Sequence, residues 1–112
     1  METVECVNKL PEDVKQCLDP KKVFMFSKSY CPYCTTAKDH LDKLGVPYQA
    51  IECDEVPMTM AHKKQLFTLS GVSTFPNIFI GNKSIGGCDN LLKLHAKGDL
   101  KKLLDQAGIK HI

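Results

Sequence analysis

The sequence of 112 residues predicts an α/β fold, a single domain over 1–112 in which helices flank a four-stranded mixed sheet. Three observations predict it. A strand–helix–strand pattern over residues 23–52 implies two parallel strands, because such a crossover returns to the same sheet with right-handed geometry. A hairpin pattern over residues 77–86 adds an antiparallel pair. Helical patterns fill much of the remaining chain, so both faces of the sheet can be covered.

The strand–helix–strand pattern begins with the apolar run 23–26, which has the length of a buried strand. A short loop leads to Pro32, which suits the first helical position because its missing N–H is not needed there. We expect this helix to end at Gly45 and the second strand to cover residues 48–52. The buried face of the helix is predicted to contain Ala37, Leu41 and Leu44.

The chain before this pattern has helical character to about Leu18, with a break at Pro11, where a second helix is predicted to begin. A further helix is predicted over residues 57–70, with Pro57 in its first turn and Gly71 at its end. The side chains expected to face inward are Val4, Val7 and Val14 in the first segment and Ala61, Leu66 and Leu69 in the second.

The hairpin pattern joins residues 77–80 to 83–86 through a Gly-Asn turn, which is typical of two antiparallel strands. After it, Asp89 is predicted to cap a helix that runs to about Lys97, and Asp99 to cap the last helix. The inward face of the last helix is predicted to contain Leu100, Leu103, Leu104 and Ala107. This order of elements describes the thioredoxin fold.

Two cysteines, Cys31 and Cys34, stand where the first strand meets the following helix. This is the carboxyl end of a central strand, where open α/β sheets bind ligands. Free N–H groups and the helix dipole favour a thiolate at Cys31, whose pKa can fall to roughly 3.5–7.5 beside a cation. The spacing predicts a redox pair, with Cys31 as nucleophile and Cys34 as resolving thiol. The alternatives are a zinc site, for which no second close-spaced ligand pair exists in the sequence, and an inert disulfide.

Composition and charge argue against several other functions. The 15 basic residues are all lysine and 13 residues are acidic, and the absence of arginine argues against nucleic-acid binding. No apolar run is long enough to span a membrane and no secretory signal is visible, so we expect a reducing, cytoplasmic location with mostly free thiols. Residues expected to have only structural or surface roles are Cys6, Cys17, Cys53, His40, His62, His95 and His111.

Three blocks of sequence resemble the glutaredoxin family, in the family's order and spacing. The first is the Cys-Pro-Tyr-Cys motif with Lys28 three residues before it. The second is Thr74-Phe75-Pro76, which is similar to the family's Thr-Val-Pro, and the third is residues 86–89, like its Gly-Gly-x-Asp. A thioredoxin would carry tryptophan before Cys-Gly-Pro-Cys, and this chain contains no tryptophan. The resemblance covers essentially the whole chain.

The resemblance implies glutathione as co-substrate and a groove that binds it. Main-chain groups of Phe75, before a cis Pro76, would bind the cysteinyl part of glutathione; Phe75 replaces the family's valine, and its larger ring is expected to reshape the groove. Asp89 would pair with the γ-glutamyl ammonium, and the N–H groups of Cys88 and Asp89 would bind the adjacent carboxylate. Lys28 would face the glycine carboxylate and favour the nucleophilic thiolate.

The remaining predicted contacts with glutathione also follow from the resemblance. Tyr33 would form a wall of the groove, Thr74 would support the loop, and Lys63 would supply a polar contact from the third helix. Cys88 would be an extra thiol beside the site, open to glutathionylation, a secondary disulfide or dimer formation, or present only for packing.

The implied function is a glutathione-disulfide oxidoreductase that reduces glutathione mixed disulfides and protein disulfides. Its partners would be glutathionylated or disulfide-containing proteins, and we expect a monomer without metal. The alternative is a dimer that binds a [2Fe–2S] cluster through Cys31 and glutathione. Pro32 argues against the cluster, because glycine or serine at that position would favour it.

Overall fold

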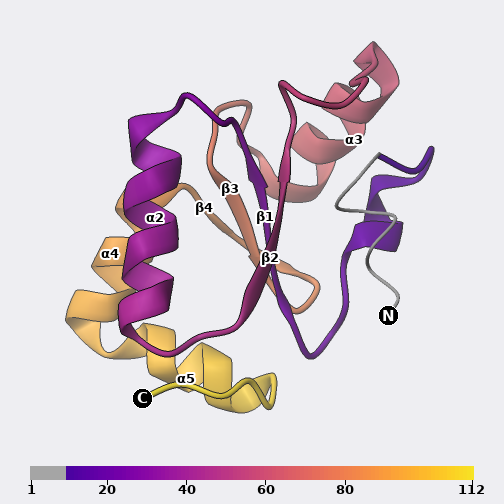
Figure 1. The fold of residues 1–112 in the computed structure, drawn as a ribbon. Helices are drawn as coiled ribbons and strands as arrows, with labels where there is room; N and C mark the ends of the chain where they lie inside the picture. Colours follow the sequence, from indigo (N-terminus) through magenta and orange to yellow (C-terminus); the bar gives the residue numbers. More distant parts are fainter. Residues whose placement is uncertain (1–9) are drawn as a thin grey trace.

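The computed structural model describes residues 10–112, and its ribbon is drawn in Figure 1. In chain order the elements are η1 (a 3-10 helix, Val14–Cys17), β1 (Val23–Ser27), α2 (Pro32–Lys43), β2 (Tyr48–Glu52), α3 (Met60–Ser70), β3 (Asn77–Ile80), β4 (Lys83–Gly86), α4 (Cys88–Lys97) and α5 (Asp99–Gln106). The predictions made for Val4, Cys6 and Val7 lie outside the described residues.

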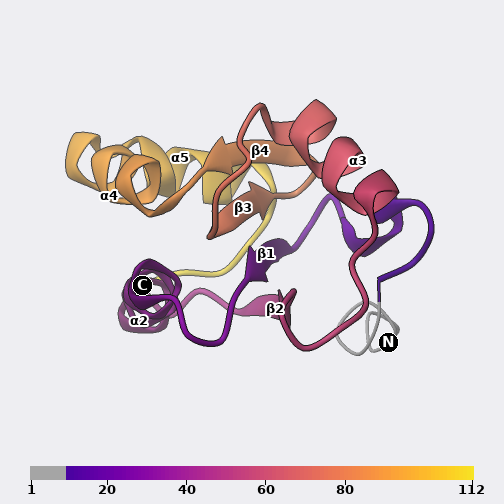
Figure 2. The same ribbon diagram turned by 90° about the horizontal axis from the view of Figure 1, so that it is seen from above.

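The sheet has the strand order β2-β1-β3-β4. β1 pairs in parallel with β2, with Val23 opposite Tyr48, and antiparallel with β3. β3 and β4 form the predicted hairpin, with Ile80 opposite Lys83. Seen from above, α2 and α4 lie on one side of the sheet and α3 lies on the other (Figure 2). This is a thioredoxin-like fold, and the predicted fold class is confirmed.

Side chains of β1 enter two apolar cores, one on each face of the sheet, because successive strand residues point to opposite faces. Val23 and Met25 pack with residues of α2, α4 and α5, whereas Phe24 and Phe26 pack with residues of α3 and η1. On the second face, the ring centroids of Phe26 and Phe79 are 5.8 Å apart in an edge-on contact. Both cores therefore fix the strand whose end leads to the cysteine pair.

The segment before β1 corrects the prediction of a helix from Pro11. Among residues 10–22, the structure contains only the short turn η1. The N–H of Val14 donates to Oε1 of Gln65 at 2.7 Å, and Nε2 of Gln65 donates to the carbonyl oxygen of Glu12 at 2.7 Å. A side chain of α3 therefore takes the backbone groups that a regular helix would have paired within itself.

The start of α3 differs from the predicted Pro57. Thr59 is the N-cap: its hydroxyl accepts from the N–H of His62 at 3.2 Å, and Nδ1 of His62 accepts from the N–H of Thr59 at 3.1 Å. This is a capping box in which histidine replaces the usual glutamate or glutamine. His62, expected at the surface, is consequently buried, and Ala61, expected to face inward, is exposed.

Glycine rather than aspartate occupies the N-cap of both later helices, which corrects two predicted caps. Gly87 precedes α4 and Gly98 precedes α5, so Asp89 and Asp99 lie inside the first helical turns. A Cβ atom on Gly87 would lie 3.3 Å from the carbonyl oxygen of Pro76. Glycine therefore lets α4 begin in close contact with the loop that leads into β3.

Two further histidines also differ from the predicted surface positions. His40 of α2 and His95 of α4 are half-buried, and their rings meet edge-on with centroids 4.6 Å apart. They lie between two helices that pack on the same face of the sheet. No helix within residues 10–112 is long and apolar enough to cross a membrane.

Candidate active site

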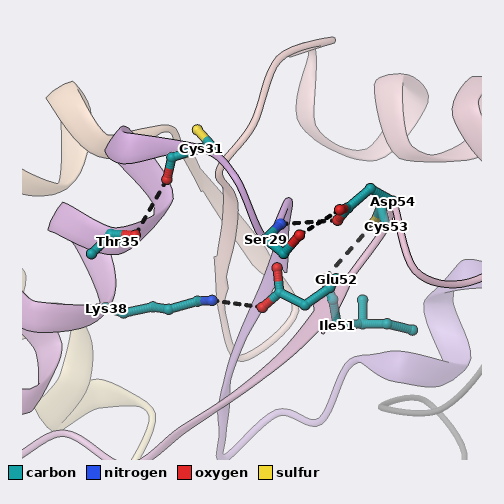
Figure 3. A network of polar contacts seen from close by, with 8 residues as sticks. All are labelled: Ser29, Cys31, Thr35, Lys38, Ile51, Glu52, Cys53 and Asp54. Atoms are coloured by element: carbon teal, nitrogen blue, oxygen red, sulfur yellow. Dashed lines mark hydrogen bonds and ion pairs between the residues drawn. The ribbon is translucent and has the colours of Figure 1, made fainter.

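Cys31 stands between the end of β1 and the start of α2. It is the N-cap of α2, with Pro32 at the start of the helix as predicted. Its N–H donates to the carbonyl oxygen of Lys28 at 3.1 Å, and its own carbonyl accepts from the N–H of Thr35 at 3.2 Å and from the Thr35 hydroxyl at 3.4 Å (Figure 3). The backbone of Cys31 is held on both sides, while its thiol is only half-buried.

Hydrogen bonds favour the thiolate form of Cys31. Burial by itself would raise the pKa of this thiol, but the N–H and thiol of Cys34, the N–H of Tyr33 and the charge of Lys28 together hold the pKa below its ordinary value. The two N–H groups belong to the first turn of α2, where backbone donors have no helical acceptor. Cys31 is therefore ionised at lower pH than an ordinary cysteine.

Cys34 lies one turn farther along α2 and is only 1% exposed. Burial raises the pKa of the Cys34 thiol, and its proximity to Cys31 adds to this, while the nearby Ser27 hydroxyl and the Lys28 backbone act in the opposite direction. The outer cysteine is thus the more acidic thiol and the inner one the less acidic. This asymmetry suits a nucleophile and a resolving thiol.

The other described cysteines are poorer nucleophiles. Cys53 and Cys88 are buried free thiols, and Cys17 is buried as well. Burial raises the pKa of Cys53 to about 12, and burial together with the charges of Asp89 and Cys31 raises the pKa of Cys88. Cys17 and Cys53 pack in the core on the α3 side of the sheet, as predicted for structural cysteines.

The loop between α3 and β3 passes beside Cys31. The peptide bond between Phe75 and Pro76 is cis, as the resemblance implied, and Sγ of Cys31 lies 3.8 Å from the carbonyl oxygen of Phe75. The buried Asn77 fixes this loop, because its Nδ2 donates to the hydroxyl of Ser70 at 2.9 Å. The carbonyl group of Phe75 is therefore held next to the thiol.

Phe75 also contacts the lysine that acts on Cys31. Nζ of Lys28 lies 4.9 Å from the centroid of the Phe75 ring and 5.9 Å from that of Tyr30. Both distances lie within the range of a cation–π contact. The ring that replaces the family's valine thus offers Lys28 an attraction that valine lacks.

A groove of about 560 Å³ lies beside Cys31. Its lining residues are Tyr33, Thr74, Phe75, Pro76, Gly87, Cys88, Asp89 and Asn90. The groove thus brings together most of the predicted glutathione contacts, and Lys28 lies next to it through Phe75. Lys63 is exposed on α3 and does not line the groove, so its role stays a prediction. The sequence analysis did not predict that Gly87 and Asn90 line the groove. The Gly-Gly turn was the available signal for Gly87, and no sequence pattern marks Asn90.

The start of α4 gives this groove an anion-binding character. No side chain caps the helix, so the first N–H groups, which include those of Cys88 and Asp89, have no helical acceptor. Such N–H groups bind carboxylates and phosphates. The exposed carboxylate of Asp89 stands at the same place, so one end of the groove offers sites for both an anion and a cation.

Sequence reasoning missed Asp54, which fixes the loop before Cys31. The Asp54 carboxylate accepts from the N–H of Ser29 at 2.9 Å and from its hydroxyl at 2.5 Å (Figure 3). The same bonds hold the pKa of Asp54 below its usual range. The available signal was topological, because segments that follow two adjacent parallel strands meet at one edge of the sheet.

The fold places this protein in the thioredoxin-like class. An acidic thiol, a buried second thiol and an adjoining groove are the elements that thiol–disulfide exchange needs. In the part of the chain from residue 10 onward, no group of three or more His, Cys, Asp or Glu side chains is arranged to hold a metal ion.

Comparison with known proteins specifies the family. The glutaredoxin family model matches residues 23–85. A glutaredoxin of Ricinus communis is 43% identical over 94 residues, which cover 84% of this chain and 92% of that protein. The crystal structure of a buckwheat glutaredoxin–glutathione complex has a TM-score of 0.79 at 36% identity, covering 96% of this chain and 94% of that one. The holo form of glutaredoxin C1 from Populus tremula x tremuloides has a TM-score of 0.73 at 37% identity, covering 83% and 92%.

The chain therefore belongs to the glutaredoxin family, whose members are generally thiol–disulfide oxidoreductases.

Proposed function

We propose that this chain reduces glutathione mixed disulfides and protein disulfides, with glutathione as the reductant. The Cys31 thiolate attacks the glutathione sulfur of a mixed disulfide. A bond forms between Cys31 and glutathione, and the substrate leaves as a thiolate that takes up a proton. A second glutathione thiolate then attacks the glutathione held on Cys31. Glutathione disulfide leaves, the Cys31 thiolate is regenerated, and the substrate has gained two electrons.

The observation that carries this proposal is a half-buried, acidic thiol beside a groove whose charges complement glutathione. Glutathione has two carboxylates, one ammonium and one sulfur. The Asp89 carboxylate suits the ammonium, the N–H groups at the start of α4 suit the neighbouring carboxylate, and Lys28 suits the glycine carboxylate. The likeness to a buckwheat glutaredoxin–glutathione complex supports the same ligand.

The other lining residues have supporting roles in this proposal. Main-chain groups of Phe75 bind the cysteinyl part of glutathione, Thr74 supports the loop and Tyr33 forms a wall. Cys88 contributes its N–H group, and its raised pKa keeps its thiol out of the reaction at neutral pH. Lys63 would act only if a bound ligand reached α3.

Protein disulfides follow a second route that uses both cysteines. Cys31 attacks the protein disulfide, and Cys34 then attacks Cys31 to release the reduced protein and form the Cys31–Cys34 disulfide. Two glutathione molecules reduce that disulfide and become glutathione disulfide. The near-complete burial of Cys34 suits a thiol that meets only Cys31 and not external substrates.

The decisive experiment measures reduction of a glutathionylated peptide by the purified chain. Glutathione disulfide is followed through added glutathione reductase and NADPH. We expect turnover that requires glutathione and is abolished in Cys31→Ser, because a serine hydroxyl is not ionised at neutral pH and cannot exchange with a disulfide. Thioredoxin reductase with NADPH should not replace glutathione. Turnover in Cys31→Ser, or equal turnover without glutathione, contradicts the proposal.

The [2Fe–2S] alternative differs in a property that purification reveals. A cluster shared by two subunits would give a brown dimer that absorbs visible light. We propose instead a colourless monomer, because Pro32 occupies the position next to Cys31. We also propose that the protein is located in the cytoplasm. Size-exclusion chromatography with an absorbance spectrum tests the first part, and imaging of a fluorescent fusion tests the second.

A further inference from the structure

A buried hydroxyl group without a partner lies at the end of β1. Ser27 is 0% exposed, and its Oγ atom has no hydrogen-bond partner. A buried polar group that forms no hydrogen bond destabilises a folded protein, and alanine at this position would avoid that penalty. Such groups are rare in native structures and call for an explanation.

The position of Ser27 places it on the face of the sheet that the resolving cysteine covers. Alternation along β1 places Ser27 on the same face of the sheet as Val23 and Met25, the face on which α2 packs. Cys34 lies in the first turn of α2 and is buried against that face. An interaction between the Ser27 hydroxyl and the Cys34 sulfur favours the thiolate form of Cys34 and counteracts the effect of burial on its pKa.

An ion pair lies on the same face. Glu52 is opposite Ser27 in the parallel register of β1 and β2. Figure 3 shows Glu52 paired with Lys38. The Oε2 atom of Glu52 lies 2.6 Å from Nζ of Lys38, and its Oε1 atom is buried without a hydrogen-bond partner. Lys38 lies one helical turn after Cys34, so its ammonium group is on the same side of α2 as the buried sulfur. The surroundings of Cys34 on this side are therefore polar, and Lys38 brings a positive charge.

We propose that Ser27 donates a hydrogen bond to the Cys34 thiolate and thereby promotes the resolving step, an inference that rests on the proposed dithiol function. In that step Cys34 loses its proton and attacks Sγ of Cys31 in the mixed disulfide. The Cys31–Cys34 bond forms, and the bond between Cys31 and the substrate breaks. The substrate leaves with the electron pair of that bond and takes up one proton, which balances the proton lost by Cys34. Ser27 is unchanged at the end.

The Ser27 hydroxyl has no hydrogen-bond partner in the reduced protein, and the charge on the Cys34 sulfur decides whether it gains one. A neutral thiol is a weak hydrogen-bond acceptor, whereas a thiolate is charged and accepts strongly. A hydrogen bond from the Ser27 hydroxyl therefore stabilises the protein little while Cys34 is protonated. It becomes favourable only when the Cys34 sulfur carries a negative charge. An interaction that appears with the developing charge accelerates a step, whereas one present throughout does not.

The test uses the full chain and an aromatic disulfide whose released thiolate is coloured. One thiolate is released when Cys31 attacks, and a second is released when Cys34 resolves the mixed disulfide; the second phase must be absent in Cys34→Ser. We expect Ser27→Ala to leave the first phase unchanged, to slow the second about tenfold at neutral pH, and to move its pH midpoint up by about one unit. Ser27→Thr, which keeps the hydroxyl, should restore the second phase.

A matched control removes a hydroxyl from the exposed side of α2. Thr36 lies on the exposed side of the helix, where its hydroxyl bonds only the carbonyl oxygen of Pro32, at 3.1 Å. Thr36→Ala should leave both phases unchanged. Ser27→Ala should also unfold at the same or a higher temperature, because the lost hydroxyl has no partner in the reduced protein.

An unchanged second phase in Ser27→Ala overturns the inference. A slower second phase with an unmoved pH midpoint and a lowered melting temperature also overturns it, because that result indicates a structural role. If the wild-type chain gives no first phase at all, the proposed function itself is refuted, and the inference falls with it.

Discussion

At the scale of single residues, Cys31 and Cys34 differ through their surroundings and not through their chemistry. The first turn of α2 supplies hydrogen bonds that lower the pKa of Cys31, whereas burial raises that of Cys34. The pattern Cys-Pro-Tyr-Cys after an apolar run was enough to predict which thiol is outermost. The depth of Cys34 could not be predicted in the same way, because it depends on how closely α2 packs on β1.

This difference predicts separate outcomes for two reactions of the Cys34→Ser variant. We expect reduction of a glutathione mixed disulfide to continue, since a second glutathione can resolve Cys31. Reduction of a protein disulfide should fall by at least about tenfold, because the internal nucleophile is lost. The measurement compares initial rates with a glutathionylated peptide and with a disulfide-bonded protein. Equal losses on the two substrates would show that the one-thiol route does not exist.

Asp89 offers a second prediction at this scale. Asp89→Ala should reduce the efficiency of glutathione use by about tenfold or more, since a charge-assisted hydrogen bond contributes about 1.5–3 kcal/mol. The pH dependence of Cys31 alkylation should stay unchanged, because Asp89 is not among the main groups that act on that thiol.

Asp99→Ala is the matched control for Asp89→Ala. Asp99 occupies the first turn of α5 as Asp89 does that of α4, but it does not line the groove. Both variants lose a favourable interaction with a helix dipole, so both should show a similar small loss of stability. If Asp89→Ala lowers only the melting temperature and leaves glutathione kinetics intact, the assignment at this end of the groove is wrong.

At the scale of elements, the hydrogen bonds of the helix ends position the loops of the site. Thr59 and His62 set where α3 begins, and Asn77 ties the loop after α3 to Ser70. Thr59→Ala should lower the free energy of unfolding by about 1 kcal/mol, because it removes an N-cap. Urea unfolding measures this. Thr68→Ala, the same change on the exposed side of the same helix, should be neutral or slightly stabilising, since alanine is the better helix former.

Some elements could be predicted from local sequence, and others could not because they depend on distant residues. Gly71 and the Gly-Asn turn were predicted correctly because their signals are local: Gly71 has φ +72° and ends α3, and the turn joins β3 to β4. The first helix was predicted wrongly because Gln65, distant in sequence, takes the backbone groups of residues 12–14. The cis bond before Pro76 followed only from the family resemblance, since about 5–6% of such bonds are cis.

At the scale of the whole molecule, two helices on one face of the sheet meet at a contact that contains the titratable side chain of His40. His40 of α2 and His95 of α4 meet edge-on, and a ring nitrogen of each is buried without a hydrogen-bond partner. Burial, then the neighbouring His95 and Lys43, lower the pKa of His40. The contact therefore favours the neutral form of His40, and protonation of His40 works against the packing of α2 with α4.

The lowered pKa of His40 gives the sign of a pH dependence. An unfolded chain binds a proton at His40 near its ordinary pKa of 6.5, whereas the folded chain binds it only at lower pH. The contribution of His40 to the free energy of unfolding is therefore complete above pH 6.5. It is lost as the pH falls toward the pKa of His40 in the folded chain. His111 acts oppositely, because a bond with the Ile112 carbonyl and then Asp105 raise its pKa. The contribution of His111 to stability increases as the pH falls to 6.5 and stays constant below that value. Below pH 6.5, only His40 of these two residues therefore changes the stability.

We therefore expect the melting temperature to fall as the pH decreases below about 6.5, and to fall less in His40→Gln. Glutamine keeps a polar side chain of similar length but has no proton to gain in this range. His111→Gln is the control and should keep the wild-type decline, since its titration in the folded chain lies above this window. Scanning calorimetry of the three proteins across the window measures both slopes. An identical decline in His40→Gln and wild type would assign the pH dependence to carboxylates elsewhere in the chain and not to the contact between α2 and α4.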